Sequence, residues 1–163
     1  MRDFIKIPQE REEILKKNEK IKEKIETLTN TKLGFDEGVS IEGESFDIYQ
    51  TKQVLNAFGR GFDVDDCLYL LDDEYGLDII NLTDFTRSKE RMTTLKGRII
   101  GTGGKTKKYI EKYTDVKTCI FGKTVGIIGK WSNINIAKEA IMKIIHGCNH
   151  NTLYRWLEKH SRI

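Results

Sequence analysis

Hydrophobic and polar residues alternate along the chain in short segments, some with the two-residue period of a strand and others with the 3.6-residue period of a helix. The first strand segment ends at Pro8, which cannot donate a hydrogen bond to a sheet. In the last helical segment of this series, Val54, Leu55 and Phe58 are spaced for one buried face. The pattern predicts a strand over 4–7, helices over 10–15 and 19–28, strands over 32–35 and 39–42, and a helix over 49–58.

A second series of segments repeats this order. A short acidic helix over 64–75 precedes it, and a last, exposed helix over 151–160 follows it. Ser132 or Asn133 can cap the closing helix of the series. The pattern predicts a strand over 78–82, helices over 90–100 and 105–113, strands over 116–121 and 124–128, and a helix that ends near His146.

The two series are also similar in sequence, which indicates an internal duplication. Ile25 to Lys32 aligns with Ile110 to Lys117, sharing Ile-Glu, a threonine, an Asn or Asp, and a lysine. After a shift of one residue, Val39 to Gly43 aligns with Val125 to Gly129. The shifted alignment then pairs Lys52, Val54, Leu55, Phe58 and Gly61 with Lys138, Ala140, Ile141, Ile144 and Gly147. We therefore expect two units of the order β-α-α-β-β-α.

In the second unit, the apolar pair Ile99 and Ile100 leads into a glycine-rich loop, Gly101-Thr102-Gly103-Gly104, between the first two helices. A loop with few Cβ atoms lets a nucleic-acid backbone approach the main chain closely. The start of the next helix offers unpaired N–H groups and the positive end of a dipole to phosphate. These features together predict a phosphate-binding loop.

This loop resembles the signature of KH domains, in which a Gly-x-x-Gly loop between two helices clamps about four nucleotides of single-stranded RNA. The resemblance implies an apolar groove lined by Ile99, Ile100, Ile110 and the strand that starts at Val116. Lys107 departs from the pattern, because many KH domains carry an aliphatic residue there. We expect RNA contacts from Arg98, Ile99, Ile100, Gly101, Thr102, Gly103, Gly104, Lys105, Lys107, Lys108 and Lys123.

The first unit carries Lys16-Lys17-Asn18-Glu19 where the second has its glycine loop. Bulky side chains, one of them anionic, should prevent close docking of an RNA backbone. We therefore predict an α/β (α+β) protein of two tandem type I KH folds, the first degenerate and suited to packing or to binding protein. The expected divisions are a degenerate unit over 1–61, an acidic linker helix over 62–76, the KH domain over 77–150 and a helical tail over 151–163.

The charge distribution supports an RNA-binding role more than the formal net charge of +3 does. Between Thr86 and Lys108 the charged residues are basic except Glu90, whereas those between Phe62 and Asp78 are all acidic. One face should thus attract phosphate and another repel it. Three widely spaced cysteines favour reduced thiols, and no apolar run reaches the roughly 18 residues that span a bilayer. A cytoplasmic location is expected, without membrane association.

Three blocks of the chain resemble archaeal members of the partner-of-Nob family of small-subunit ribosome-assembly factors. They are Leu95 to Thr106, Gly122 to Gly129 and Asn56 to Phe62. The resemblance implies binding to the 3′ end of small-subunit ribosomal RNA during maturation, through Gly101 to Lys105. It also implies the Nob endonuclease and the alpha subunit of translation initiation factor 2 as partners.

Other functions leave weaker or incomplete patterns in the sequence. A nucleotide-binding P-loop ending at Gly104-Lys105-Thr106 would need glycine where Ile99 stands, and one ending at Gly122-Lys123-Thr124 would need it at Lys117. A metal site at His146, Cys148, His150 and His160 lacks the usual ligand spacing. We expect no enzyme activity, metal or cofactor. A general KH protein that binds messenger RNA or acts with the exosome, and a scaffold without RNA binding, stay open.

Overall fold

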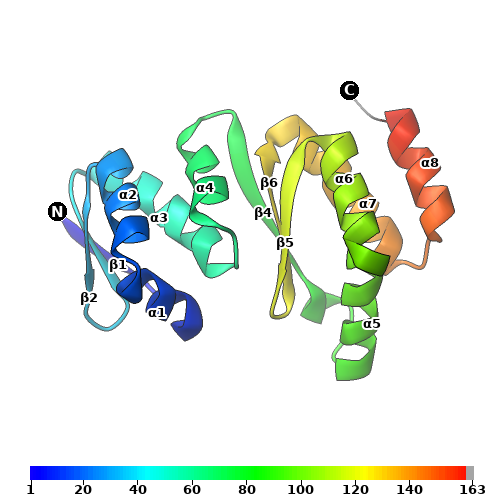
Figure 1. The fold of residues 1–163 in the computed structure, drawn as a ribbon, viewed down its shortest axis with the longest axis horizontal. Helices are drawn as coiled ribbons and strands as arrows, with labels where there is room; N and C mark the ends of the chain where they lie inside the picture. The colour runs from blue at the N-terminus through cyan, green and yellow to red at the C-terminus, as the bar shows by residue number, and fades with distance from the viewer. Residues whose placement is uncertain (161–163) are drawn as a thin grey trace. The chain divides into compact units, whose positions relative to one another are not determined.

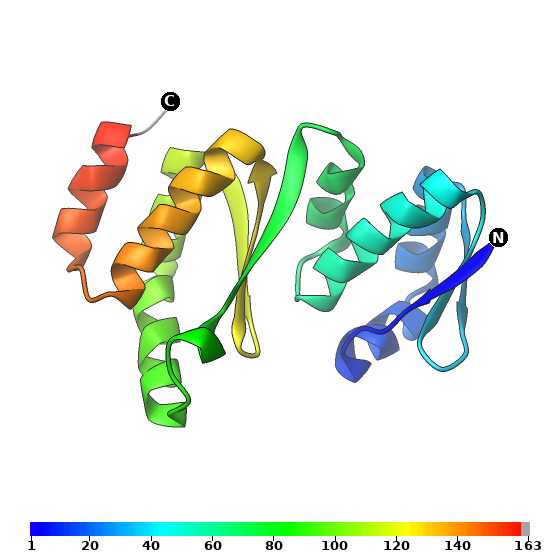
Figure 2. The same ribbon diagram turned by 180° about the vertical axis from the view of Figure 1, so that it is seen from behind.

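The computed structural model describes residues 1–160 and divides the chain into two compact units, one from Met1 to Asp73 and the other from Glu74 onward. Each unit contains an antiparallel three-stranded sheet with helices packed against one of its faces (Figures 1 and 2). This mixed architecture confirms the predicted α+β class. Within the described residues, no helix is both long and apolar enough to cross a membrane.

In the first unit the sheet order is β1-β3-β2, with the hairpin strand β3 in the centre. Val39 and Ile41 of β3 are fully buried, as are Leu15 and Ile25, and α3 packs on β3. The elements of this unit are β1 (Arg2–Ile5), α1 (Gln9–Lys17), α2 (Glu19–Thr29), β2 (Lys32–Phe35), β3 (Val39–Glu42), α3 (Ser45–Gly59), α4 (Val64–Cys67) and the 3₁₀ turn η1 (Leu68–Leu71).

The second unit repeats this arrangement in the order β4-β6-β5, and its core lies between the sheet and the helices α5, α6 and α7. A further helix, α8, covers α6 and α7 on the side away from the sheet (Figure 1). Its elements are β4 (Tyr75–Asn81), η2 (Leu82–Asp84), α5 (Lys89–Ile100), η3 (Thr102–Gly104), α6 (Lys105–Thr114), β5 (Val116–Phe121), β6 (Thr124–Lys130), α7 (Trp131–Ile145) and α8 (His150–His160).

The duplication extends to individual hydrogen bonds. Arg11 of α1 donates bonds of 2.8 and 2.7 Å to carbonyl oxygens at and just beyond the end of α3. Arg98 of α5 donates bonds of 3.1 and 2.6 Å to the corresponding carbonyls at the end of α7. In each unit a guanidinium therefore satisfies carbonyl groups that a helix end leaves unpaired, where the dipole also favours a cation.

A second repeated contact joins the middle helix to the edge strand. The carboxylate of Glu26 on α2 accepts a hydrogen bond of 2.8 Å from the amide of Leu33 on β2. Glu111 on α6 accepts one of 2.9 Å from the amide of Thr118 on β5. An Asp–Lys ion pair also joins the first strand of each unit to the helix that follows its hairpin, from Asp3 to Lys52 on α3 and from Asp78 to Lys138 on α7. The sequence repeat thus corresponds to a repeated structure.

Two of the predicted strands begin earlier than expected, because their partner strands set their length. β1 covers residues 2–5 rather than 4–7, since its register with β3 runs from Arg2 opposite Glu42 to Ile5 opposite Val39. β4 begins at Tyr75 rather than Asp78, because it pairs along the whole of β6. The acidic helix expected over 64–75 is also shorter: it forms α4 and η1, which pack on α3.

The predictions for the last two helices were wrong in two details. α7 begins at Trp131, directly after β6, and neither Ser132 nor Asn133 caps it. The backbone amide of Trp131 instead donates to the carbonyl of Glu74 at 3.3 Å. α8 was expected to be exposed, yet Leu153 and Leu157 on one face are fully buried against the core.

Candidate nucleic-acid interface

The backbone of the glycine loop explains why glycine occupies three of its four positions. Gly101, Gly103 and Gly104 have φ angles of 77°, 62° and 78°, a region that residues with a Cβ rarely adopt. The amide of Gly101 still bonds to the Gly97 carbonyl at 2.8 Å, and the Gly104 amide bonds to the Gly101 carbonyl at 3.1 Å. The chain therefore leaves α5, makes one tight 3₁₀ turn and enters α6.

The two sides of this turn differ in how closely they are packed. A Cβ built on Gly101 would lie 2.2 Å from Oγ1 of Thr106, so this glycine faces the protein interior. A Cβ on Gly103 would meet nothing within 4 Å, and one on Gly104 would meet only the Lys108 side chain at 3.9 Å. The outer side of the turn, including the exposed Thr102, is thus open to an approaching ligand.

The first turn of α6 lies directly behind the loop and has no side-chain cap, because Gly104 occupies the N-cap position. The Lys105 amide donates to the Thr102 carbonyl, no side chain caps the amides that follow it, and the helix dipole favours negative charge there. Lys105 and Lys108 are exposed in the same turn, with the Lys105 ammonium 5.5 Å from the centre of the Tyr154 ring. Lys107 is half-buried and pairs with Glu111 at 3.4 Å.

Not every predicted contact residue is in a position to reach RNA. Arg98 is bound to the end of α7, and the same role of Arg11 in the unit without a glycine loop shows that this contact serves the fold. Ile99 is 1% exposed and belongs to the core, as do Ile110 and Val116. Of the three isoleucines and Val116 that were expected to line an apolar groove, Ile100 is the one with a largely accessible side chain, at 36% exposed. Lys123 is exposed in the turn between β5 and β6.

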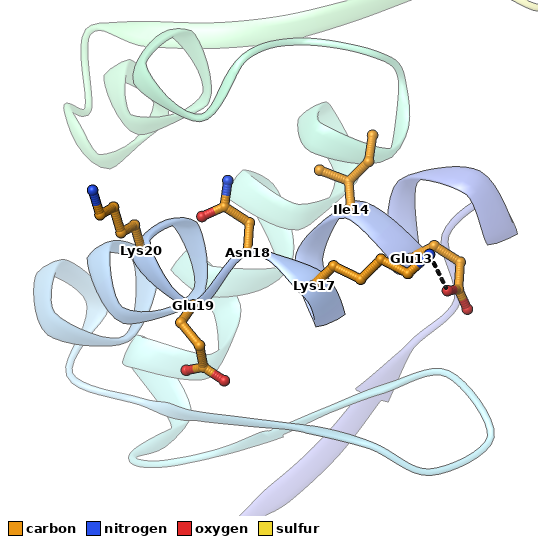
Figure 3. Close-up of a pocket in the computed structure, with 6 residues that line it drawn as sticks. All are labelled: Glu13, Ile14, Lys17, Asn18, Glu19 and Lys20. Atoms are coloured by element: carbon orange, nitrogen blue, oxygen red, sulfur yellow. Dashed lines mark ion pairs between the residues drawn. The ribbon is translucent and has the colours of Figure 1, made fainter.

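At the corresponding junction the first unit differs more than its sequence indicated. α1 continues to Lys17, so Asn18 is the single residue between the two helices, and Lys16 and Glu19 are helical. The Asn18 side chain accepts a hydrogen bond from the Ile21 amide and caps α2. A hollow of about 510 Å³ lies here (Figure 3). Its lining residues are Glu13, Ile14, Lys17, Asn18, Glu19 and Lys20.

Two observations make this hollow a poor phosphate site. Lys17 and Lys16 are both within ion-pair distance of Glu13, at 3.7 and 4.0 Å, and Figure 3 marks the first of these pairs. The leading amides of α2 are already partly satisfied by its own cap. The first unit therefore lacks both the loop and the uncapped helix start that the second unit has.

Two side chains next to the loop were not among the predicted site residues. The Tyr154 hydroxyl is 2.9 Å from Oγ1 of Thr106, and Nε2 of His150 is 3.0 Å from the carbonyl oxygen of Arg98. Both come from α8, which the sequence pattern predicts to be an exposed helical tail. Their spacing of four residues, shared with Leu153 and Leu157, was the available signal of a packed face.

His150 thus bonds to a backbone carbonyl, and the histidines among the described residues do not form a common metal site. Among residues 1–160, no three His, Cys, Asp or Glu side chains gather in a group that could hold a metal ion. Cys67, Cys119 and Cys148 form no disulfide in this part of the chain.

Comparison with known proteins gives matches over nearly the whole chain. Residues 76–162 match the second KH domain of PNO1, described as a eukaryotic type KH-domain (KH-domain type I). The KH domain-containing protein MJ0443 of Methanocaldococcus jannaschii is 33% identical over 96% of this chain and 73% of its own length. The pre-rRNA-processing protein PNO1 of Phaeosphaeria nodorum is 36% identical over 82% of this chain, which spans 49% of that relative.

Solved structures agree with these matches. Dim2p from Pyrococcus horikoshii has a TM-score of 0.87 and 35% identity, with 98% of this chain and 99% of that chain covered. A chain of the a/eIF2alpha–aDim2p–rRNA complex from the same organism has a TM-score of 0.87 and 34% identity, covering 98% and 93%. The similarity therefore includes both units, the duplicated fold and the loop between α5 and α6.

Proposed function

Since the chain belongs to the PNO1 family of KH-domain proteins, we propose that it binds the 3′ end of small-subunit ribosomal RNA as a factor in ribosome assembly and pre-rRNA processing. The observation that carries the proposal is the open glycine loop in front of an uncapped α6, with exposed lysines around it. One related structure contains both RNA and an initiation-factor subunit, which supports the same role.

The contacts follow from the geometry of the loop. The outer side of Thr102 and Gly103 admits an RNA backbone, and the uncapped amides that follow Lys105 in the first turn of α6 donate hydrogen bonds to a phosphate. Lys105 and Lys108 add charge that draws the strand to this position. The adjoining bases lie toward Ile100 and the edge strand β5, as in other KH domains. Lys107 takes part more weakly, because Glu111 already neutralises it.

The protein acts by holding and shielding an RNA end rather than by catalysing a reaction. The second unit, with the KH domain expected over 77–150, is the RNA-binding part. The first unit, expected over 1–61, and the acidic segment over 62–76 serve protein contacts. The alpha subunit of translation initiation factor 2 and the Nob endonuclease are the proposed partners, in line with the related complex. A cytoplasmic location suits this role, and the absence of disulfides among the described residues supports it.

The test is RNA binding by a Thr102→Asp, Gly103→Asp double variant, titrated with a single-stranded oligonucleotide of the ribosomal 3′ end and with a scrambled one. Both positions are exposed, a Cβ on Gly103 meets no atom, and aspartate is one of the few residues that tolerate a left-handed φ such as the 62° of Gly103. The fold should therefore persist, and circular dichroism can verify it. Two carboxylates in the loop repel phosphate, and we expect binding to weaken at least tenfold, by about 1.4 kcal/mol.

A matched control places the same change of net charge in the first unit. The Lys17→Ser, Lys20→Ser variant removes two positive charges at the junction of α1 and α2. We expect it to bind RNA nearly as well as the wild type does. Equal losses in both double variants would mean that overall charge, not the loop, holds the RNA. Equal affinity for the scrambled oligonucleotide would favour a general RNA-binding protein of the KH class.

A further inference from the structure

α8 contacts both ends of the glycine loop through two side chains on one of its faces. His150 and Tyr154 are four residues apart, and their rings stack with 15° between the planes and 6.2 Å between the centres. Nε2 of His150 reaches the carbonyl oxygen of Arg98, in the last turn of α5. The hydroxyl of Tyr154 reaches Oγ1 of Thr106, in the first turn of α6. One helix face thus contacts the last turn of α5 before the loop and the first turn of α6 after it.

The helix that carries these two side chains is itself firmly placed. Asn149 caps it by accepting a hydrogen bond of 2.8 Å from the Thr152 amide, and its two core leucines are fully buried. The last turn of α8 is bound to α6 by a hydrogen bond of 2.8 Å, which the Tyr109 hydroxyl donates to the carboxylate of Glu158. The Glu158 carboxylate raises the pKa of Tyr109, so this hydroxyl remains a donor at any physiological pH. α8 is therefore a rigid support rather than a loose tail.

The contact at Thr106 reaches the loop directly. Its Oγ1 is the atom that a Cβ on Gly101 would meet at 2.2 Å, so the loop backbone packs on the hydroxyl that Tyr154 holds. Threonine has few χ1 rotamers, and its hydrogen bond with Tyr154 selects the one that fits under Gly101. The Tyr154 ring also lies 5.5 Å from the Lys105 ammonium. Tyr154 therefore positions both the loop backbone and a lysine next to the phosphate site.

The first unit shows that a unit of this fold forms without such a support. At the offsets of the internal repeat, the positions of Thr106, His150 and Tyr154 are occupied by Ile21, Val64 and Leu68. None of these three side chains can donate or accept a hydrogen bond. Both units have an arginine that bonds to carbonyls at a helix end and a glutamate that accepts a bond from an edge-strand amide. The polar contacts from α8, by contrast, lie beside the glycine loop of the second unit.

We propose that His150 and Tyr154 are positioning residues for RNA binding, which hold the glycine loop in its binding shape before RNA arrives. The inference rests on the proposed function, because it gives this loop its ligand. A loop that is already ordered loses less conformational freedom on binding, and this raises affinity without a new contact to the ligand. Neither side chain needs to touch RNA, and the number of phosphates bound is the same with or without the support.

The experiment compares Tyr154→Phe, which removes only the hydroxyl, with Tyr154→Leu, which also removes the ring. Tyr113→Phe is the control, because this ring stacks in the same cluster, 4.8 Å from that of Tyr109, at the far end of α6 from the loop. Three quantities are measured: amide hydrogen exchange over 101–106 in the RNA-free protein, RNA affinity, and its dependence on salt. Thermal unfolding shows whether global stability is retained.

For Tyr154→Phe we expect exchange in the loop to rise about fivefold and RNA affinity to fall by about the same factor, the equilibrium equivalent of one neutral hydrogen bond. The salt dependence should not change, because no phosphate contact is removed. His150→Ala should act in the same direction, and Tyr113→Phe should behave as the wild type. Unchanged loop exchange in Tyr154→Phe would overturn the inference.

Two further outcomes separate this inference from its premise. If only Tyr154→Leu loses affinity, the ring stacks on a base instead of supporting the loop, and the positioning role is wrong. If the wild type binds no RNA, the proposed function fails, while loop exchange in the RNA-free variants still decides whether α8 orders the loop.

Discussion

Replacing Gly101 with alanine tests whether the loop depends on the backbone shape described above. At φ 77° and ψ 170°, Gly101 lies in a region that is essentially restricted to glycine, where other residues cost about 1–3 kcal/mol. The new methyl group would also lie 2.7 Å from the backbone nitrogen of Thr106, which cannot move without shifting the start of α6. Overpacking of this kind costs about 1–3 kcal/mol, so we expect a total loss of about 2–6 kcal/mol.

The assay is thermal unfolding followed by circular dichroism. For a unit of this size each kcal/mol corresponds to about 4–8 °C, so the transition of the second unit should fall by roughly 10 °C or more. Gly97→Ala is the control: Gly97 lies within α5, and an added Cβ meets no atom within 4 Å. Alanine is the better helix former, and we expect a gain of up to about 1 kcal/mol. If Gly101→Ala unfolds within about 2 °C of the wild type, the loop is not built as described.

Four further variants separate the fold from the site. Arg98→Ala should destabilise the second unit by about 2–4 kcal/mol in a denaturant titration, by removing two charged hydrogen bonds, and leave the salt dependence of RNA binding unchanged. Lys105→Ala should leave stability nearly unchanged but reduce the slope of log affinity against log salt by about 0.7. Leu153→Ala should cost about 2–5 kcal/mol, because its side chain is fully buried. Asp3→Asn should lower stability at pH 7, because the hydrogen bond from Lys52 holds the pKa of Asp3 below its usual value. That contribution is fully present above the unfolded pKa and is lost as pH falls through the lower folded pKa, so the difference in unfolding free energy between the two proteins should begin to shrink as pH falls below about 4.

Each of these predictions has an outcome that contradicts it. A reduced salt slope in Arg98→Ala would return this residue to the RNA interface. An unchanged slope in Lys105→Ala would remove it from that interface. A fully stable Leu153→Ala would show that α8 does not pack as described, and a difference for Asp3→Asn that does not shrink at all as pH falls below about 4 would mean that its ion pair is not the cause.

Hydrophobic periodicity and the internal repeat were sufficient to predict the order of elements and the glycine loop. The ends of β1 and β4 could not be predicted in the same way, because they depend on the registers with β3 and β6. The burial of Leu153 and Leu157 was missed because two leucines in a polar terminal segment do not show where the helix docks. Local patterns therefore indicate which elements exist, and tertiary partners decide their extent.

The candidate site shows a related limit. Arg98 was predicted to bind RNA because it is basic and next to the loop, but its guanidinium bonds to carbonyls 46 and 50 residues away in the sequence. The repeat gave no warning, because its alignment places Glu13 at the position of Arg98; only the structure shows that Arg11 makes the equivalent bonds in the unit that lacks the loop. Ile99 was expected to line a groove, and it is instead part of the core. A residue adjacent to a motif in sequence need not face the ligand.

The central claim is that the glycine loop of the second unit binds the RNA backbone and that the equivalent junction of the first unit does not. Backbone amide shifts of the isotope-labelled protein, recorded while the ribosomal 3′-end oligonucleotide is added, test this in one experiment. We predict large shifts for the amides of Thr102 to Lys108 and little change for those of Lys16 to Lys20. Shifts concentrated at the first-unit junction, or none at the glycine loop in the presence of bound RNA, would contradict the account.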